Sequence, residues 1–318
     1  MVAVIEIQPW HWAGFILVIL FFLALDLGVF HPKARPPGFR AALAGSLIWV
    51  LLAAGFAGAL AFWRGPEESL QFLAGYVVEY SLSLDNVFAM ALIFAYFGVP
   101  PALQHRVLFW GVLGALAMRG LMIGTGVELL QQFHWLFYVM GAFLLWTGLK
   151  WGFSKQAVVR PEQNRVVRLA RRFFPVTRDF QGQNFFGAVA GRRALTPLAL
   201  ALLTIEATDL IFATDSIPAI FAITQNAFIV FTSNICAVLG LRSLYFVLAG
   251  AMSYFRFLKT GLALVLALIG VKMLVSRWYV VSTAVTLTAV AGIIGVSILA
   301  SLAAAGGKSP AVKTESPD

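Results

Sequence analysis

The sequence is short of charged residues, cysteine and histidine. Only 12% of its 318 residues are charged and 60% are hydrophobic, whereas a soluble domain has roughly 25% charged residues. A single cysteine, Cys236, excludes an intrachain disulfide framework and a cysteine-cluster metal site. No nucleotide-binding motif is present, and the few histidines lie at the ends of apolar runs: His11, His31, His105 and His134. These shortages exclude a water-soluble fold and predict an integral membrane protein.

Long apolar runs divide the chain, and most reach the roughly 20 residues that cross a hydrocarbon core. The sequence therefore predicts an all-α polytopic membrane protein with about nine transmembrane helices. The first run has no basic segment before it and no small-residue cleavage site after it, so we expect it to be retained. The approximate bounds of the runs are 11–30, 42–63, 70–98, 106–127, 135–152, 196–223, 227–250, 258–275 and 279–303.

The basic residues lie mostly in alternate connections between these runs. If the N-terminus is outside, 17 Lys and Arg fall inside, nine of them between 153 and 195. Only Arg64 and Arg277 then fall outside. The positive-inside rule thus predicts an outside N-terminus and a cytoplasmic C-terminus. The net charge of +9 reflects cytoplasmic loops, and we expect no nucleic-acid partner.

Two stretches inside apolar runs carry paired carboxylates. They are Glu79-Tyr-Ser-Leu-Ser-Leu-Asp85-Asn86 and Asp209-Leu-Ile-Phe-Ala-Thr-Asp215-Ser216. Each has an acid, a second acid six positions later, and then a short amide or hydroxyl side chain. A charge at the centre of a membrane helix costs roughly 2.5–3.5 kcal/mol on insertion scales. Two matched copies therefore predict the two halves of one ion site.

The similarity between the halves extends beyond these stretches. Arg119 and Arg242 lie in the span that follows each stretch, and Gly-x-Lys ends the span after that, at 148–150 and 270–272. The third to fifth spans thus match the sixth to eighth. Because three spans per copy is an odd number, the second copy enters the membrane from the opposite side. This predicts a 3+3 inverted repeat with a substrate site near the midplane.

The repeat also predicts how the chain is divided. Two peripheral helices (1–68) precede the first three-helix repeat (69–152), a basic cytoplasmic loop (153–195) and the second repeat (196–275). A last transmembrane helix (276–303) and a disordered tail (304–318) follow. Within the basic loop, 165–174 separates at 100° per residue into an arginine side and an apolar side. Either this segment is a short helix lying on the anionic inner leaflet, or the loop is flexible and serves only topology.

The candidate ligands carry only oxygen, which suits Mg, Ca or Mn better than Zn or Cu. Six acids and four bases lie inside the predicted spans, and the surplus of two negative charges would suit one divalent cation or two monovalent ions or protons. Some acids pair with arginines or carry protons, since six exceed what one ion needs. The predicted metal ligands are Glu79, Asp85, Asn86, Glu206, Asp209 and Asp215. The predicted supporting residues are Asp26, Ser83, Ser216, Arg119 and Arg242, of which Asp26 and the arginines have the alternative of purely structural ion pairs.

Helix geometry limits which of these acids act together. Residues i and i+6 lie about 120° apart, so Glu79 and Asp85 cannot share a face of a continuous helix. Either the helix breaks between them or the second carboxylate serves a different partner. Pro218, just past Asp215, favours a break in the second stretch. Glu206 and Asp209, at i and i+3, share a face.

The two acidic stretches, read as 79–88 and 208–219, resemble the TerC family. These bacterial membrane proteins are named for tellurium resistance and are placed with LysE-type transporters. The segments 25–27 and 240–245 also resemble its pattern, and the resemblance covers about residues 15–300. It implies a multi-pass protein of the bacterial inner membrane, of the type linked to manganese export. The matching acidic positions are Glu79, Asp85, Glu206, Asp209 and Asp215.

We therefore expect a secondary transporter that exports a divalent cation, Mn²⁺ first, by alternating access of the two repeats. The ion is cargo rather than a permanent cofactor, and membrane lipid is the other expected partner. We expect no enzymatic activity, because no nucleophile and base pair stands out. One alternative is a tellurite or oxyanion resistance protein that uses Arg119, Arg242, Lys150 and Lys272. Another is a non-transporting accessory protein that delivers metal or anchors a complex through 153–195.

Overall fold

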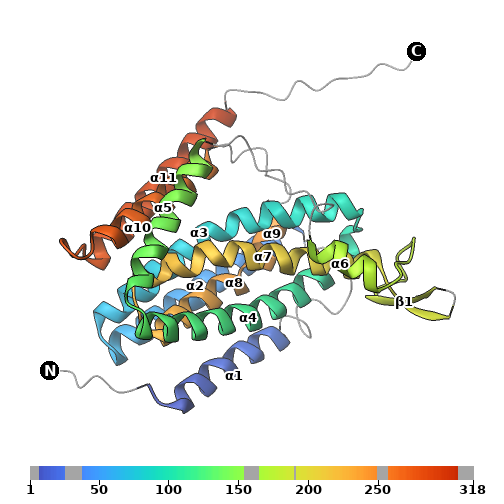
Figure 1. Ribbon diagram of the computed structural model, residues 1–318, viewed down its shortest axis with the longest axis horizontal. Coiled ribbons are helices and arrows are strands. Elements are labelled where there is room, and N and C mark those ends of the chain that lie inside the picture. The colour runs from blue at the N-terminus through green and yellow to red at the C-terminus, as the bar shows by residue number, and fades with distance from the viewer. Residues whose placement is uncertain (1–6, 26–37, 154–164, 190, 249–256, 307–318) are drawn as a thin grey trace.

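The computed structural model describes residues 7–25, 38–153, 165–189, 191–248 and 257–306 (Figure 1). Helices make up nearly all of this part of the chain, and one short hairpin lies at one end of the molecule. The helices are α1 (Pro9–Leu25), α2 (Phe39–Trp63), α3 (Pro66–Phe97), α4 (Pro101–Gln132), α5 (Trp135–Phe153), α6 (Arg165–Phe173), α7 (Pro197–Phe221), α8 (Ala227–Leu239), α9 (Leu241–Leu248), α10 (Leu258–Val275) and α11 (Thr283–Gly306). The strands are β1 (Phe186–Val189) and β2 (Arg192–Leu195).

Eight stretches of described helix are long and apolar enough to cross a membrane. The pair α8 and α9 counts as one of them, and α1, with 17 residues, is shorter. The predicted all-α polytopic fold is thereby confirmed, and each predicted apolar run overlaps a described helix. The orientation, the inverted repeat and the domain division stay predictions. α11 extends to Gly306, so the predicted tail begins later than 304, and its remainder lies outside the described residues.

The segment predicted as a basic loop contains both a helix and a hairpin. α6 forms where the arginine periodicity predicts a helix. Its Val167 is buried against Leu195 and Leu200, whereas Leu169 and Phe173 stay 55% and 69% exposed. α6 therefore packs on α7 through Val167 and the half-buried Ala170, and it leaves Leu169 and Phe173 uncovered beside its arginines.

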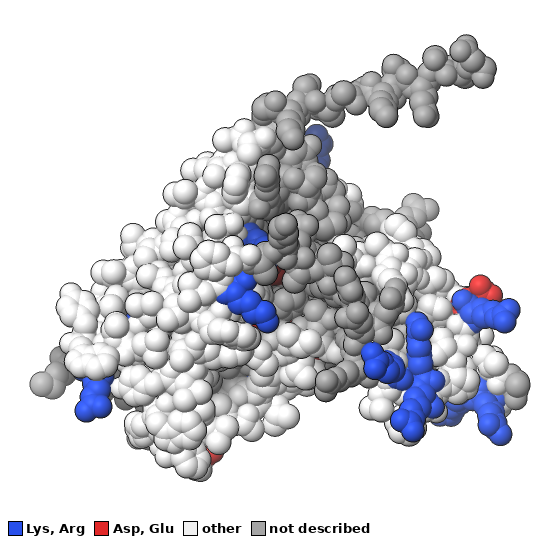
Figure 2. Space-filling view, turned by 45° about the horizontal axis from the view of Figure 1, so that its top comes forward, with Lys and Arg blue, Asp and Glu red and all other residues white. Residues whose placement is uncertain are grey.

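The hairpin that follows α6 was not predicted. β1 pairs antiparallel with β2, from Phe186 opposite Leu195 to Val189 opposite Arg192. Gly191 has φ +75°, the left-handed region that glycine enters without strain. Figure 2 shows most of the visible Lys and Arg gathered at this end of the molecule.

The predicted break near Pro218 is wrong, since both helices that carry the acidic stretches are continuous. α7 runs unbroken through Asp215 and ends three residues after Pro218, at Phe221. Proline has no N–H for the carbonyl four residues earlier, and its ring crowds that carbonyl. Because only three helical residues follow Pro218, this disturbance falls at the end of α7 and does not split it. α3 likewise passes through Glu79 and Asp85 without interruption.

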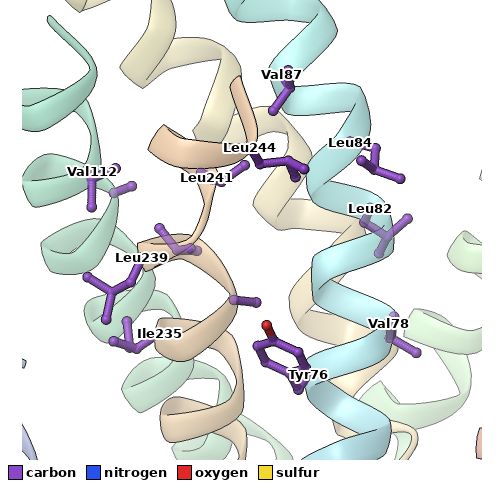
Figure 3. Close-up of a cluster of buried hydrophobic side chains, with 14 of the residues drawn as sticks. Tyr76, Val78, Leu82, Leu84, Val87, Val112, Ile235, Leu239, Leu241 and Leu244 are labelled. Carbon is purple, nitrogen blue, oxygen red and sulfur yellow. The ribbon is translucent and has the colours of Figure 1, made fainter. Parts of the chain in front are cut away.

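The interruption lies instead at Gly240, between α8 and α9. The ring of Tyr80 on α3 approaches this position, where an added Cβ would come within 3.3 Å of Tyr80 Cε2. Figure 3 shows the two short helices joined by a bend beside α3, with Leu239 and Leu241 on either side of it. The predicted span 227–250 is thus two helices, and the part after Leu248 lies outside the described residues.

Glycines allow a close backbone approach between α5 and α10. A Cβ on Gly148 would lie 2.7 Å from the Ala263 carbonyl oxygen, and one on Gly270 would lie 2.7 Å from the Gly141 oxygen. Small residues allow such backbone contact in membrane helices, where packing replaces the hydrophobic effect. α5, α10 and α11 form one group of helices, set at an angle to the group that contains α3, α7 and α8 (Figure 1).

Candidate functional site

A fully buried arginine lies where α3, α4, α7 and α8 meet. Arg119 of α4 is 0% exposed. Its Nε and Nη2 donate to the two carboxylate oxygens of Asp209 on α7, both at 3.0 Å. Its Nη1 donates to Glu79 Oε1 on α3 and, at 3.3 Å, to Asn234 Oδ1 on α8. The guanidinium thus joins three other helices through charged and amide groups.

Asn86 completes this cluster from a second position on α3. Its Nδ2 donates to Asp209 Oδ1 at 3.1 Å. Asn86 lies seven residues after Glu79, two helical turns away, so both side chains point from the same face of α3. We call Glu79, Asn86, Arg119, Asp209 and Asn234 the Arg119 cluster.

The Arg119 cluster carries a net negative charge when its acids are ionised, because two carboxylates face one guanidinium. Charged residues are rare in membrane segments unless they pair inside the bundle. Arginine suits this position because its planar fork holds a carboxylate through two bonds at once. The ion pair therefore lowers the energetic cost of burying these charges within the bundle. It leaves one carboxylate in excess.

Several polar atoms of the cluster are not satisfied by these contacts. Within the described part of the chain, Glu79 Oε2, Asn86 Oδ1 and Asn234 Nδ2 are buried and have no hydrogen-bond partner. Buried polar atoms are nearly always bonded in native proteins, and exceptions call for a physical explanation. Two of the three are oxygens, which are the ligand atoms that hard divalent cations prefer.

A third acid, Glu206, lies close to the cluster on α7. It is near enough to Asp209 for their charges to interact, as expected for positions three apart on one helix. Its carboxylate lies directly against Gly114 of α4, where any Cβ would overlap it. Glu206 Oε2 has no partner among the described residues. Gly114 therefore makes the space that the Glu206 carboxylate occupies.

The second acids of the two stretches face other helices. Asp85, half-buried on α3, interacts electrostatically with Lys259 at the start of α10. Asp215, buried on α7, is close to Thr147 and Lys150 of α5. This agrees with the helical-face argument, in which the second carboxylate of each stretch serves a different partner from the first.

The supporting residues are spread over the bundle. Ser83 and Ser216 are buried, and their hydroxyl oxygens have no partner within the described segments. Arg242 is buried in α9. Asp26 lies outside the described residues.

The structure does not bring the six predicted ligands into one group. Among the residues described, no three His, Cys, Asp or Glu side chains lie together in a way that would hold a metal ion. Glu79, Asn86 and Asp209 meet at Arg119, Glu206 is adjacent, and Asp85 and Asp215 point elsewhere. The metal-binding role of these side chains stays a prediction.

The cluster is closed in this conformation. A crevice beside it is lined by Asn86, Thr208 and Asp209 but has no room for a water molecule. An ion could therefore reach these oxygens only after the surrounding helices move.

Sequence reasoning missed Asn234 as a member of the cluster. It is fully buried on α8, eight residues before Arg242, in the segment that matches α4 in the proposed repeat. A buried amide inside an apolar span was the available signal, since polar residues at that depth pair with one another.

Comparisons with known proteins identify relatives along nearly the whole chain. The model of a family described as "Integral membrane protein TerC family" matches residues 64–309. "Uncharacterized membrane protein STKORF319" of Myxococcus xanthus is 51% identical over 93% of this chain and 92% of its own length. Two proteins named "Putative membrane-bound redox modulator Alx" are each 43% identical. The one from Salmonella typhi covers 92% of this chain and 93% of its own length. The one from Escherichia coli K12 covers 90% and 92%.

No solved structure matches the chain significantly. The family match covers more than half of the sequence, and the relatives are named as membrane proteins. This chain is an integral multi-pass membrane protein that belongs to the TerC family.

Proposed function

We propose that this protein is a transporter that exports a divalent metal cation, with Mn²⁺ as the first cation to test. The observation that carries the proposal is the Arg119 cluster. Its two acids come from the two halves of the proposed repeat and meet on one buried arginine, with a negative charge in excess. Secondary transporters with inverted repeats place their substrate sites at such an interface.

The chemistry of the unsatisfied atoms favours a hard cation. Glu79 Oε2, Asn86 Oδ1 and Glu206 Oε2 are oxygens without partners within the described chain. Carboxylate and carbonyl oxygens suit Mg, Ca and Mn. The cation is the transported substrate, and the proposal includes neither a permanent cofactor nor an enzymatic reaction.

Arg119 acts in this proposal as the internal counter-charge of the empty carrier. It offsets one of the two negative charges of Glu79 and Asp209 when no cation is bound, so the helices change conformation with less uncompensated charge inside the bilayer. An entering cation competes with the guanidinium for the same oxygens. Because one side chain links α3 and α7, release of either carboxylate would loosen the contact between the two halves.

In this proposal Asp85 and Asp215 lie on the route that the cation takes between the solvent and the Arg119 cluster, and they do not belong to the central site. Each is a buried or half-buried acid close to a lysine, Lys259 or Lys150. A cation or a proton could be exchanged at these positions between the solvent and the cluster. An ion gradient, a proton gradient or the membrane potential would supply the energy.

An oxyanion substrate fits the cluster less well. The guanidinium of Arg119 already donates to Asp209, Glu79 and Asn234. An anion would have to displace two carboxylates from it and would meet an excess of negative charge. A direct thiol–disulfide function, suggested by the name of the Alx relatives, would need a second cysteine from another molecule, because this chain has only Cys236.

We also propose that the protein lies in the bacterial inner membrane with α6 on the inner leaflet. The support is the pairing of exposed Leu169 and Phe173 with Arg168, Arg171 and Arg172 on one short helix. Apolar residues beside arginines are typical of helices that lie in the headgroup region of an anionic leaflet. α6 is fixed at the start of α7 through Val167, which sets its depth.

Transport by purified protein in proteoliposomes tests the proposal. We expect flux of Mn²⁺ but not of tellurite, with Mg²⁺ and Ca²⁺ measured alongside. Gly114→Ala should abolish flux because its methyl group displaces the Glu206 carboxylate, and Glu206→Gln should do the same. Gly111→Ala is the matched control, since its Cβ would lie 3.5 Å from Ile205, an ordinary contact.

Tellurite flux, or loss of metal flux in Gly111→Ala to the same extent as in Gly114→Ala, would refute the assignment. An absence of any metal flux in a folded, correctly inserted protein would favour the accessory role.

A further inference from the structure

A cavity of about 560 Å³ separates α1 from the rest of the bundle. Its walls come from α1, α2 and α8, and almost all of its lining is apolar. The volume lies within the range of about 300–1,000 Å³ that is usual for ligand pockets. The cavity is separate from the Arg119 cluster, with which it shares no lining residue.

α1 reaches the bundle across this cavity through aromatic rings. Phe15 contacts Phe56 at 5.5 Å and Phe231 at 6.0 Å between ring centroids, and Trp12 contacts Phe228 at 5.3 Å. Its opposite face is apolar and uncovered, with Leu17 66% exposed. Aromatic contacts thus hold the helix beside a gap instead of closing it by direct backbone packing.

The membrane decides what fills such a gap. Apolar cavities do not hold water, because water there has no polar partners. A void in a packed interior forfeits the contacts of every atom that lines it. Hydrocarbon from the surrounding bilayer is the material at hand, and an acyl chain lies parallel to the helices that form the walls.

One end of the cavity offers a polar contact as well. His11 lines the cavity and is 8% exposed, with Trp10 and Trp63 rings 3.4 Å and 4.6 Å from its own. The backbone N–H of Gln8 donates a hydrogen bond to His11 Nδ1 at 2.9 Å. The neutral His11 ring therefore carries its proton on Nε2. Nε2 is buried and has no partner among the described residues. Tryptophans mark the membrane interface, where the ester carbonyls of phospholipids lie.

We propose that this cavity binds a phospholipid, with one acyl chain between α1 and α2 and an ester oxygen accepting from His11 Nε2. The lipid then fills the space between α1 and the rest of the bundle and connects them through its own contacts. This inference rests on the cavity and on His11, and it does not depend on what the protein transports.

Two glycines in the walls allow the cavity to be filled without disturbing the fold. An added Cβ at Gly14 or at Gly55 meets no atom within 4 Å, and both residues line the cavity. Gly58 is the matched control, since it lies on the same helix as Gly55, is equally free of contacts and does not line the cavity.

Native mass spectrometry of the purified full-length protein, after detergent washing and re-addition of phosphatidylglycerol, tests the proposal. We expect wild type and Gly58→Phe to retain one phospholipid, and Gly55→Phe and Gly14→Phe to retain about tenfold less. His11→Phe, which keeps the apolar wall but loses the donor, should retain less lipid than wild type.

Equal retention by Gly55→Phe, Gly14→Phe and Gly58→Phe would overturn the proposal. So would a wild-type protein that retains only detergent, or a retained molecule whose mass is that of a quinone. Circular dichroism confirms that each variant is folded before the comparison is made.

Discussion

Replacing Arg119 with methionine is the perturbation that the structure describes most sharply. The substitution keeps much of the side-chain volume but removes the cation that Glu79 and Asp209 share. Two carboxylates are then left in a site where the arginine itself is fully buried. Removing one partner of a buried ion pair costs about 3–5 kcal/mol. We expect a loss of that size in the free energy of unfolding.

A companion variant separates the lost ion pair from lost packing. Arg119→Met combined with Glu79→Gln and Asp209→Asn removes all three charges and leaves amides of similar shape. An unpaired buried amide costs less than an unpaired buried carboxylate, so the triple variant should recover part of the lost stability. Because the three residues are in contact, their effects should be strongly non-additive.

Denaturant titration of the protein in detergent micelles, followed by circular dichroism, supplies the measurement. Lys150→Met is the matched control, since Lys150 interacts with Asp215 but is an exposed cation near the end of its helix, 4.7 Å from the Trp146 ring. Its loss should cost about 1 kcal/mol or less. The reasoning is refuted if Arg119→Met costs no more than Lys150→Met, or if the triple variant is less stable than Arg119→Met alone.

Three further predictions follow from the path, the helix packing and α6. Asp85→Asn and Asp215→Asn should each abolish Mn²⁺ export while the protein still inserts, and normal manganese tolerance of cells carrying either variant would contradict this. Gly148→Leu should destabilise the α5–α10 contact by about 1–3 kcal/mol through overpacking. Gly152→Leu should not, since an added Cβ at Gly152 would lie 3.9 Å from its nearest neighbouring atom. Thermal unfolding in micelles compares the two variants. Amide hydrogen exchange of residues 165–173 should be slower in anionic than in neutral nanodiscs. Replacing Arg168, Arg171 and Arg172 with Gln should remove this difference. Equal exchange of the wild-type protein in both lipids would count against the placement of α6 on the leaflet.

The membrane helices could be predicted from the sequence because hydropathy is a local property. Each apolar run found in the sequence overlaps a helix, and the ends that lie within the described residues differ by a few residues. The helical-face argument was equally local. It separated Glu79 from Asp85 by about 120°, and the structure gives them different partners, Arg119 and Lys259.

The interruptions of the helices depend on tertiary contacts, and there the prediction failed. Pro218 has the sequence signature of a break but lies in the last turn of α7. Gly240 looks like an ordinary small packing residue, yet α8 ends there against the ring of Tyr80. The interruption at Gly240 thus depends on its contact with α3, which the local sequence does not reveal. The β1–β2 hairpin was likewise not predicted, since the arginines of β2 fitted the pattern of a basic cytoplasmic loop.

The candidate site was predictable in its members but not in its pairing. The sequence identified Glu79, Asp209 and Arg119 as functionally important, and it predicted that some acids pair with arginines. Which acid meets which arginine depends on how α3, α4 and α7 are rotated against one another. Asn234 was missed as well. Its place inside an apolar span was a local signal, but its contact with Arg119 depends on how α8 lies against α4.

Binding of Mn²⁺ to the purified protein, followed by electron paramagnetic resonance, tests the central claim most directly. The carboxylate oxygens of α3 and α7 around Arg119 are predicted to hold the cation. Wild type and Glu128→Gln, a variant of an exposed acid near the end of α4, should therefore bind Mn²⁺ saturably. Glu79→Gln with Asp209→Asn should lose this binding. Equal Mn²⁺ binding by the double variant and wild type would contradict the account.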